Sequence, residues 1–108
     1  MEESLFVKAF GTTPFIRVMD YLIGNMLFDV SLQDICDGTG LARNTVSGVL
    51  KNFLELGIAK STREIGRAKM IALNRENSFV KHLIKLDLEL SKEYSDKIIE
   101  KAKIAVRA

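Results

Sequence analysis

The stretch "DICDGTGLARNTVSGVLKNFLELG", residues 34–57, carries the clearest structural pattern in the sequence. Gly38 and Gly40 follow shortly after Ile35, and a run with helical apolar spacing comes after them. The outward positions of this run carry Arg, Asn, Thr and Ser, not the mixture of Glu and Lys that usually covers a solvated helix. The stretch therefore predicts two short helices joined by a glycine turn, the second of which has a face of hydrogen-bonding groups.

The same stretch fits the helix-turn-helix pattern when Leu32 takes its first position. The fifth position, where the two helices cross, requires a small residue and holds Cys36, while the ninth requires the turn glycine and holds Gly40. Apolar residues fill the four positions that hold the helices together: Ile35, Leu41, Val46 and Val49. Agreement at all six positions predicts a helix-turn-helix.

The residues before this motif predict two further helices. Residues 4–10 fit a helical face better than a strand. Thr13 is a good N-cap, and Pro14 suits the first position of a helix that ends near residue 24 or 25. Phe28 to Val30 read as a short link, with some strand character. Ser31 then caps the next helix, with Asp34 completing a capping box.

The residues after the motif predict a hairpin and a long helix. The motif's second helix runs from about residue 42 to 56, with Leu54 among its inward residues, and Gly57 ends it. Runs at 58–63 and 69–73 read as strands joined by residues 64–68 around Gly66. Residues 76–108 keep a helical apolar stripe throughout. The fold class is thus mainly α with a small β-hairpin, a winged helix-turn-helix followed by a long C-terminal helix.

Length and composition favour one globular unit. The chain has 108 residues, of which 28% are charged and 47% hydrophobic, as in ordinary folded domains. We expect a winged DNA-binding domain at 1–75 and a dimerisation helix at 76–108 within one compact unit. Residues 31–75 hold seven basic and four acidic residues, a net charge of +3, whereas residues 1–30 have a net charge of −2. The positive charge is concentrated where an anion could bind.

Several classes of protein are disfavoured by the sequence. One cysteine, Cys36, gives no disulfide and no cysteine-based metal site. The sequence contains neither a signal peptide nor an apolar run of about 18 residues, so a cytoplasmic protein without a membrane partner is expected. No Ser/His/Asp or Cys/His set is readable, and the carboxylates are scattered among basic residues. We therefore expect no enzymatic activity, no cofactor and no metal.

The segment "SLQDICDGTGLARNTVSGVLKNFLELGIAKSTREIGRAKMIALNREN", residues 31–77, resembles the MarR-like and ArsR-like winged-helix regulators, especially small archaeal ones. In those families basic residues surround a wing glycine, and a Leu-Asn pair ends the second wing strand, as Leu73 and Asn74 do here. The resemblance covers about residues 9–90 and implies a transcriptional regulator. The metal-binding cysteines and histidines of ArsR-type sensors are absent, so metal sensing is not implied.

This interpretation assigns the second motif helix to the DNA major groove. Its candidate DNA-binding residues are Ala42, Arg43, Asn44, Thr45, Ser47, Gly48 and Lys51. Arg can bind two acceptors of guanine and Asn can pair with adenine, while small residues allow close approach. The wing adds three basic residues for phosphates or the minor groove: Arg63, Arg67 and Lys69.

The long C-terminal helix predicts a homodimer, since it is longer than a small domain needs to cover its own core. Its candidate dimerisation residues are Phe79, Leu83, Leu86, Leu90, Tyr94 and Ile98. The predicted function is a homodimeric, sequence-specific regulator that binds double-stranded DNA. A winged-helix protein-interaction module within a transcription, replication or partition complex is the alternative, and a small-molecule effector remains open. The polar helix face and basic wing favour DNA.

Overall fold

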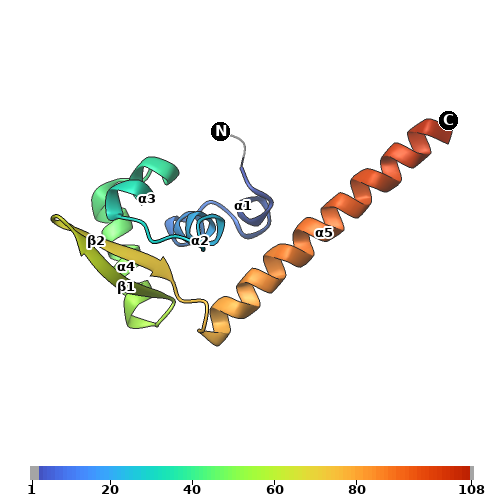
Figure 1. The fold of residues 1–108 in the computed structure, drawn as a ribbon. Coiled ribbons are helices and arrows are strands. Elements are labelled where there is room, and N and C mark those ends of the chain that lie inside the picture. The colour runs from blue at the N-terminus through green and yellow to red at the C-terminus, as the bar shows by residue number, and fades with distance from the viewer. Residues whose placement is uncertain (1–2, 108) are drawn as a thin grey trace.

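The computed structural model describes residues 3–107, with side chains described through residue 101. The elements in chain order are α1 (Leu5–Phe10), α2 (Pro14–Gly24), α3 (Leu32–Thr39), α4 (Arg43–Glu55), β1 (Ala59–Ile65), β2 (Ala68–Leu73) and α5 (Ser78–Arg107). Helices dominate and the two strands form an antiparallel hairpin, which confirms the predicted fold class. Figure 1 shows the helix-turn-helix and hairpin at one end of the molecule, with α5 running away from them.

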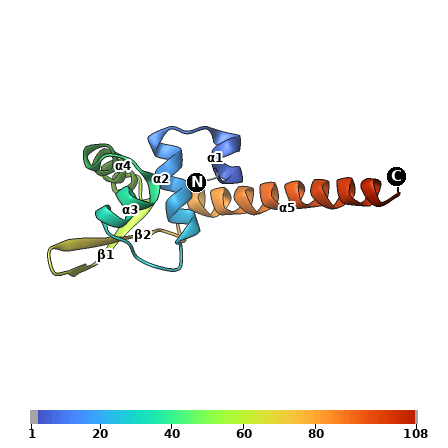
Figure 2. The same cartoon turned by 90° about the horizontal axis from the view of Figure 1, so that it is seen from above.

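Side-chain caps set the start of the two N-terminal helices. Thr13 caps α2 and Pro14 takes its first helical position, as predicted. Residues 5–10 form the predicted helix, and Ser4 caps it. The Ser4 hydroxyl also donates a hydrogen bond of 2.7 Å to the Asp20 carboxylate of α2. This bond helps to fix α1 beside α2, and Figure 2 shows α1 lying next to the first half of α5.

The helix-turn-helix forms where the sequence predicts it. Ser31 and Asp34 make the complete capping box of α3: the Ser31 hydroxyl accepts from the Asp34 N–H at 3.1 Å, and the Asp34 carboxylate accepts from the Ser31 N–H at 2.9 Å. Gly40 ends α3 with a φ of 74°, and its N–H donates to the Cys36 carbonyl at 2.8 Å. Glycine adopts this left-handed conformation without steric cost, which permits the tight turn into α4.

The apolar core lies beneath the helix-turn-helix and the hairpin. Its largest fully buried side chains are Phe6, Val18, Met19, Leu22, Ile35, Val46, Phe53 and Val80. Leu41 and Val49 pack against this core, and Cys36 belongs to it, so the predicted register is confirmed. The prediction for Leu54 was wrong. Its side chain is 40% exposed, because it lies on the side of α4 that faces the hairpin rather than the core.

The hairpin is longer, and its turn shorter, than the sequence predicts. Strands were expected at 58–63 and 69–73, but the pairing extends to Ile65. Only Gly66 and Arg67 remain between the strands, and Gly66 has a φ of 61°. A glycine with positive φ at the first position of a two-residue turn is typical of hairpins, because it matches the twist of the strands. The wing therefore ends in a sharp tip.

The link before α3 adds a single pairing to the hairpin. Val30 exchanges both backbone hydrogen bonds with Ile71, each 2.8 Å long. The expected strand character of this link is thus limited to one bridge, because Ser31 immediately begins the capping of α3. The bridge fastens the start of α3 to the wing.

A junction rich in asparagine leads into α5. The side-chain amides of Asn74 and Asn77 both donate to the Gly57 carbonyl, at 2.9 and 3.0 Å. Asn77 also accepts from the Val80 N–H at 3.1 Å and so caps the helix. For this reason α5 begins at residue 78, two residues after the predicted start. Its first turn is anchored by Val80, which is fully buried.

The second half of α5 leaves the body of the molecule. Its 30 residues correspond to about 45 Å at ~1.5 Å per residue, and the molecule measures 59 Å along its longest axis. Every side chain from residue 92 to residue 101 is exposed, and both views show this part of α5 running past α1 (Figures 1 and 2). Across the described residues, none of the helices has the length and apolar character needed to cross a membrane.

Candidate nucleic-acid interface

The predicted recognition residues all lie on the exposed side of α4 and its N-cap. Val46, Leu50 and Phe53 anchor the helix in the core, and the opposite side presents Ala42, Arg43, Asn44, Thr45, Ser47, Gly48 and Lys51. Ala42 is the N-cap and makes no side-chain capping bond. The first N–H groups of α4 therefore point outward without a side-chain acceptor at the cap, which suits a phosphate oxygen.

A groove of about 700 Å³ runs between α4 and the wing. It brings together five of the predicted residues from two separate elements: Arg43, Ser47, Lys51, Arg67 and Lys69. Its apolar lining includes Leu50, Ile71 and Leu54, which explains why Leu54 is exposed. The groove is thus edged by cations and hydrogen-bonding groups, as a surface that contacts a polyanion requires.

The remaining α4 residues lie outside this groove. With 3.6 residues per turn, Asn44 and Gly48 continue the stripe of Arg43 and Ser47 on the outer side of the helix. Thr45 lies on the far edge of that stripe, next to the partly buried Val49. The groove residues and the outer stripe form a continuous exposed surface, on which Thr45 is peripheral.

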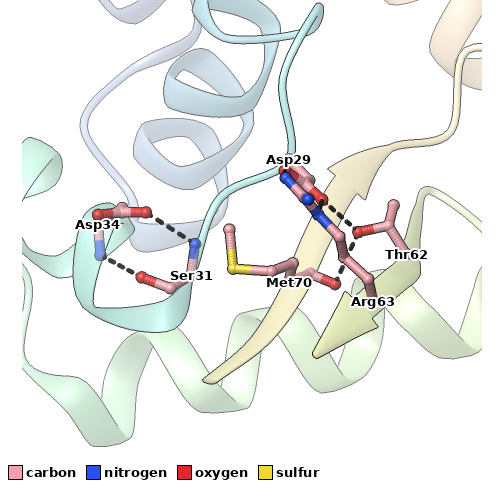
Figure 3. Close-up of polar contacts among 6 residues, drawn as sticks. All are labelled: Asp29, Ser31, Asp34, Thr62, Arg63 and Met70. Carbon is pink, nitrogen blue, oxygen red and sulfur yellow. Dashed lines mark hydrogen bonds and ion pairs between the residues drawn. The ribbon is translucent and has the colours of Figure 1, made fainter. Parts of the chain in front are cut away.

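Arg63 lies away from Arg67 and Lys69. The Arg63 Nε donates to the Asp29 carboxylate at 2.8 Å, and its Nη2 donates at 3.2 Å. The Thr62 hydroxyl donates to the same carboxylate at 2.7 Å, as Figure 3 shows. All three side chains, of Asp29, Thr62 and Arg63, line a second depression of about 740 Å³ that also includes Lys60 and Arg75. Arg63 is therefore tethered on a different face from Arg67 and Lys69.

A β-bulge explains this placement. Thr62 and Arg63 of β1 both lie opposite the single residue Met70 of β2. Side chains alternate along a regular strand, but a bulge breaks the alternation and lets two successive residues reach the same group. Thr62 and Arg63 can consequently both bind Asp29. Neither the bulge nor the pairing of Asp29 with the wing was predicted from the sequence.

The contact with Arg63 and Thr62 lowers the pKa of the Asp29 carboxyl group. The hydrogen bonds from Arg63 and Thr62 lower the pKa of Asp29 from 3.8 to about 2, and the bond to Asp29 raises the pKa of Arg63. Both groups are therefore charged at neutral pH. Since the Arg63 side chain is 63% exposed, solvent screens the pair, and its role is mainly geometric.

Gln33 is a further polar residue at the groove, and it was not predicted from the sequence. Its side-chain oxygen accepts from the Arg43 Nη1 at 2.9 Å, and its Nε2 donates to the Asp37 carboxylate at 2.8 Å. Gln33 and Asp37 are four residues apart on α3, a spacing that places side chains on one face of a helix. This spacing was visible in the sequence, but the contact with α4 depends on how the two helices cross.

The described side chains offer no cluster of residues that could coordinate a metal ion. Within the part of the chain whose side chains are described, no three His, Cys, Asp or Glu residues cluster in a way that could hold an ion. Cys36, on α3, is buried in the apolar core.

No protein-family model matches the chain, and no curated protein matches it either. Solved structures do match. MepR of Staphylococcus aureus, described as a transcription regulator of the multidrug efflux pump MepA, is similar with 17% identity and a TM-score of 0.63 over 88% of this chain and 68% of MepR. A mutant of MepR bound to an oligodeoxyribonucleotide has 15% identity and a TM-score of 0.66, over 95% of this chain and 78% of the mutant chain.

A MarR-family regulator from Neisseria meningitidis is similar as well, with 21% identity and a TM-score of 0.60, over 87% of this chain and 66% of that one. These species give no support to the expected archaeal resemblance. Similarity at this level of identity establishes the shared fold. The chain therefore has the winged helix-turn-helix fold of MarR-like transcription regulators.

Proposed function

We propose that this protein is a transcriptional regulator that binds double-stranded DNA sequence-specifically as a homodimer. The observation that carries the proposal is the groove in which Arg43, Ser47 and Lys51 of α4 lie with Arg67 and Lys69 of the wing. The fold shared with an oligonucleotide-bound MepR mutant supports it. A DNA-binding regulator of this kind would act in the cytoplasm.

In this proposal α4 enters the major groove. Arg43 takes the two acceptors of a guanine and Asn44 pairs with an adenine. Ser47 and Lys51 contact base edges or phosphates along the same stripe, and Gly48 lets the helix backbone approach closely. Ala42 and Thr45 lie toward the DNA backbone, at the N-terminus and edge of α4.

The wing contacts the adjacent backbone or minor groove through Arg67 and Lys69. Arg63 contributes less in this arrangement, because Asp29 holds it on another face and neutralises its charge. Each phosphate that is neutralised adds about 0.9 to the slope of log affinity against log salt. Loss of Arg67 should therefore lower the salt slope more than loss of Arg63.

The dimer forms through α5. Four of its predicted dimerisation residues are about half exposed: Phe79, Leu86, Tyr94 and Ile98 at 51, 49, 48 and 50%. Leu83 and Leu90 are partly buried and continue the stripe at helical spacing. Burial of this stripe against a second copy would remove large apolar side chains from water. A twofold dimer with recognition helices about 34 Å apart would select a pseudo-palindromic site.

Selection from a random-sequence duplex pool tests this function. The wild type should enrich a pseudo-palindrome, and the variant Arg43→Ala, Asn44→Ala should keep only weak, salt-sensitive binding. A control variant, Lys81→Ala, removes one charge from an exposed position on α5, outside the groove, and should enrich the wild-type sequence. Absence of wild-type binding at low salt would reject the DNA function and favour a protein partner.

A further inference from the structure

Three side chains couple α3 to the first residue of the recognition helix: Asp37, Gln33 and Arg43. We propose that Gln33 is a positioning residue for sequence readout, which holds the Arg43 guanidinium at the edge of the groove in an orientation set by Asp37. This inference rests on the proposed function and identifies a determinant of specificity outside the recognition helix.

The direction of the two hydrogen bonds is fixed by chemistry. An ionised carboxylate only accepts hydrogen bonds, and a guanidinium only donates them. Gln33 must therefore turn its NH₂ group to Asp37 and its oxygen to Arg43, and the reverse orientation would lose both bonds. The distances of 2.8 and 2.9 Å agree with this assignment. Asp37 thus determines which atom of Gln33 faces Arg43.

The bond to Gln33 does not use up the donors of Arg43. Only Nη1 is engaged, and a guanidinium has further N–H groups that can take both acceptors of a guanine. Gln33 and Arg43 both line the groove between α4 and the wing. The guanidinium is therefore held beside the surface that would receive DNA while it keeps its capacity to read a base.

Holding Arg43 in advance lowers the cost of binding. A free arginine side chain gives up much rotamer freedom when it orders on DNA, and a side chain ordered in the free protein gives up less. The support is itself firm, because the capping box of Ser31 and Asp34 fixes the N-terminus of α3. Gln33 lies in the first turn after that cap.

Two other roles for Gln33 make different predictions. A Gln–Asp pair at this spacing can simply stabilise α3, in which case substitution changes the unfolding free energy and leaves base preference intact. Gln33 could also touch DNA itself, in which case its loss remains costly when Arg43 is already absent. A positioning role predicts loss of base preference that depends on Arg43 being present.

The experiment measures discrimination, defined as the affinity for the duplex enriched by the wild type divided by the affinity for a shuffled duplex. Gln33→Ala should lower discrimination about two- to tenfold, the range expected for ordering one long side chain. Asp37→Ala should lower it as well, although removal of a negative charge by itself raises affinity for every duplex. Glu76→Ala, at an exposed position outside the groove, is the matched charge control and should not change discrimination.

A double variant, in which Gln33→Ala is added to Arg43→Ala, distinguishes a positioning role of Gln33 from direct contact with DNA. Adding Gln33→Ala to Arg43→Ala should cost no further discrimination, because Gln33 acts through Arg43. If Arg43→Ala lowers discrimination while Gln33→Ala does not, the positioning role is rejected and the proposed function stands. A further loss in the double variant also rejects it, since Gln33 would then contact DNA directly. If the wild type itself shows no discrimination, both the proposed function and this inference are wrong.

Discussion

Gly38 shows at the scale of one residue that a glycine can be required by packing instead of by backbone conformation. The sequence suggested that the glycines at 38 and 40 serve the turn, but only Gly40 has a positive φ. A Cβ placed on Gly38 would lie 2.2 Å from the Tyr21 ring, which is far inside van der Waals contact. Gly38 therefore lets α3 pack closely against the Tyr21 ring of α2.

We predict that Gly38→Ala destabilises the fold by about 1–2 kcal/mol. Alanine gains about 1 kcal/mol of helix propensity over glycine, but moving the Tyr21 ring costs more, as overpacking usually does. Gly48→Ala is the matched control, because nothing lies within 4 Å of its added Cβ, and it should stabilise the protein by about 0.5–1 kcal/mol. Urea unfolding at one fixed protein concentration measures both. Equal stabilisation by the two variants would contradict the packing role.

At the scale of the elements, local chemistry predicted the helices well. Thr13, Pro14 and Ser31 define helix starts by capping and by the fixed φ of proline, which depend only on neighbouring residues. The turn at Gly40 follows from the same kind of rule. These features could be read from the sequence because the groups that satisfy them are close in the chain.

Features that depend on distant residues were missed. The bulge in β1 turns the Arg63 side chain to the same face as Thr62, because a shift of one residue in strand pairing moves a side chain to the other face of the strand. Nothing in the sequence near residue 63 indicates that bulge. Leu54 has the correct helical spacing for the core but lies toward the groove, since the hairpin leaves that side of α4 open. The partnership of Gln33 with Arg43 depends on the crossing of two helices.

The tether between Asp29 and the wing predicts a pH effect. The pKa of Asp29 is lowered in the folded protein from 3.8 to about 2, so its contribution to stability is complete above pH 3.8 and is lost as the pH falls toward 2. Asp29→Asn should remove this part of the acid dependence, because the side chain no longer titrates.

The measurement is the thermal unfolding temperature of each protein, recorded from about pH 5 to about pH 2, which spans the ordinary and the lowered pKa of Asp29. Identical pH curves for the wild type and Asp29→Asn would show that the tether contributes nothing to stability.

In the whole molecule, the far half of α5 carries apolar side chains that no other part of the described chain covers. That half carries Tyr94 and Ile98, both about half exposed, on a helix that leaves the body of the fold. An isolated amphipathic helix gains most of its stability from packing of its apolar face. A second copy of the chain would supply that packing.

We predict that Tyr94→Glu with Ile98→Glu converts a dimer into a monomer of 12.1 kDa, because two buried carboxylates in an apolar interface are costly. Lys81→Ser with Lys85→Ser changes the net charge by the same amount on the opposite side of α5 and should remain dimeric. Sedimentation equilibrium measures the mass. A wild-type protein that is monomeric at high concentration would refute the dimer.

The most direct test of the DNA-binding surface is a map of backbone amide chemical shifts when a mixed-sequence duplex is added to the ¹⁵N-labelled protein at low salt. We predict that the largest changes fall on Ala42, on residues 43–51 of α4 and on residues 66–69 of the wing. Leu27, Phe28 and Lys60, on the other face, should change little. Changes concentrated on that other face, or on the far half of α5, would contradict the claim that the groove between α4 and the wing binds DNA.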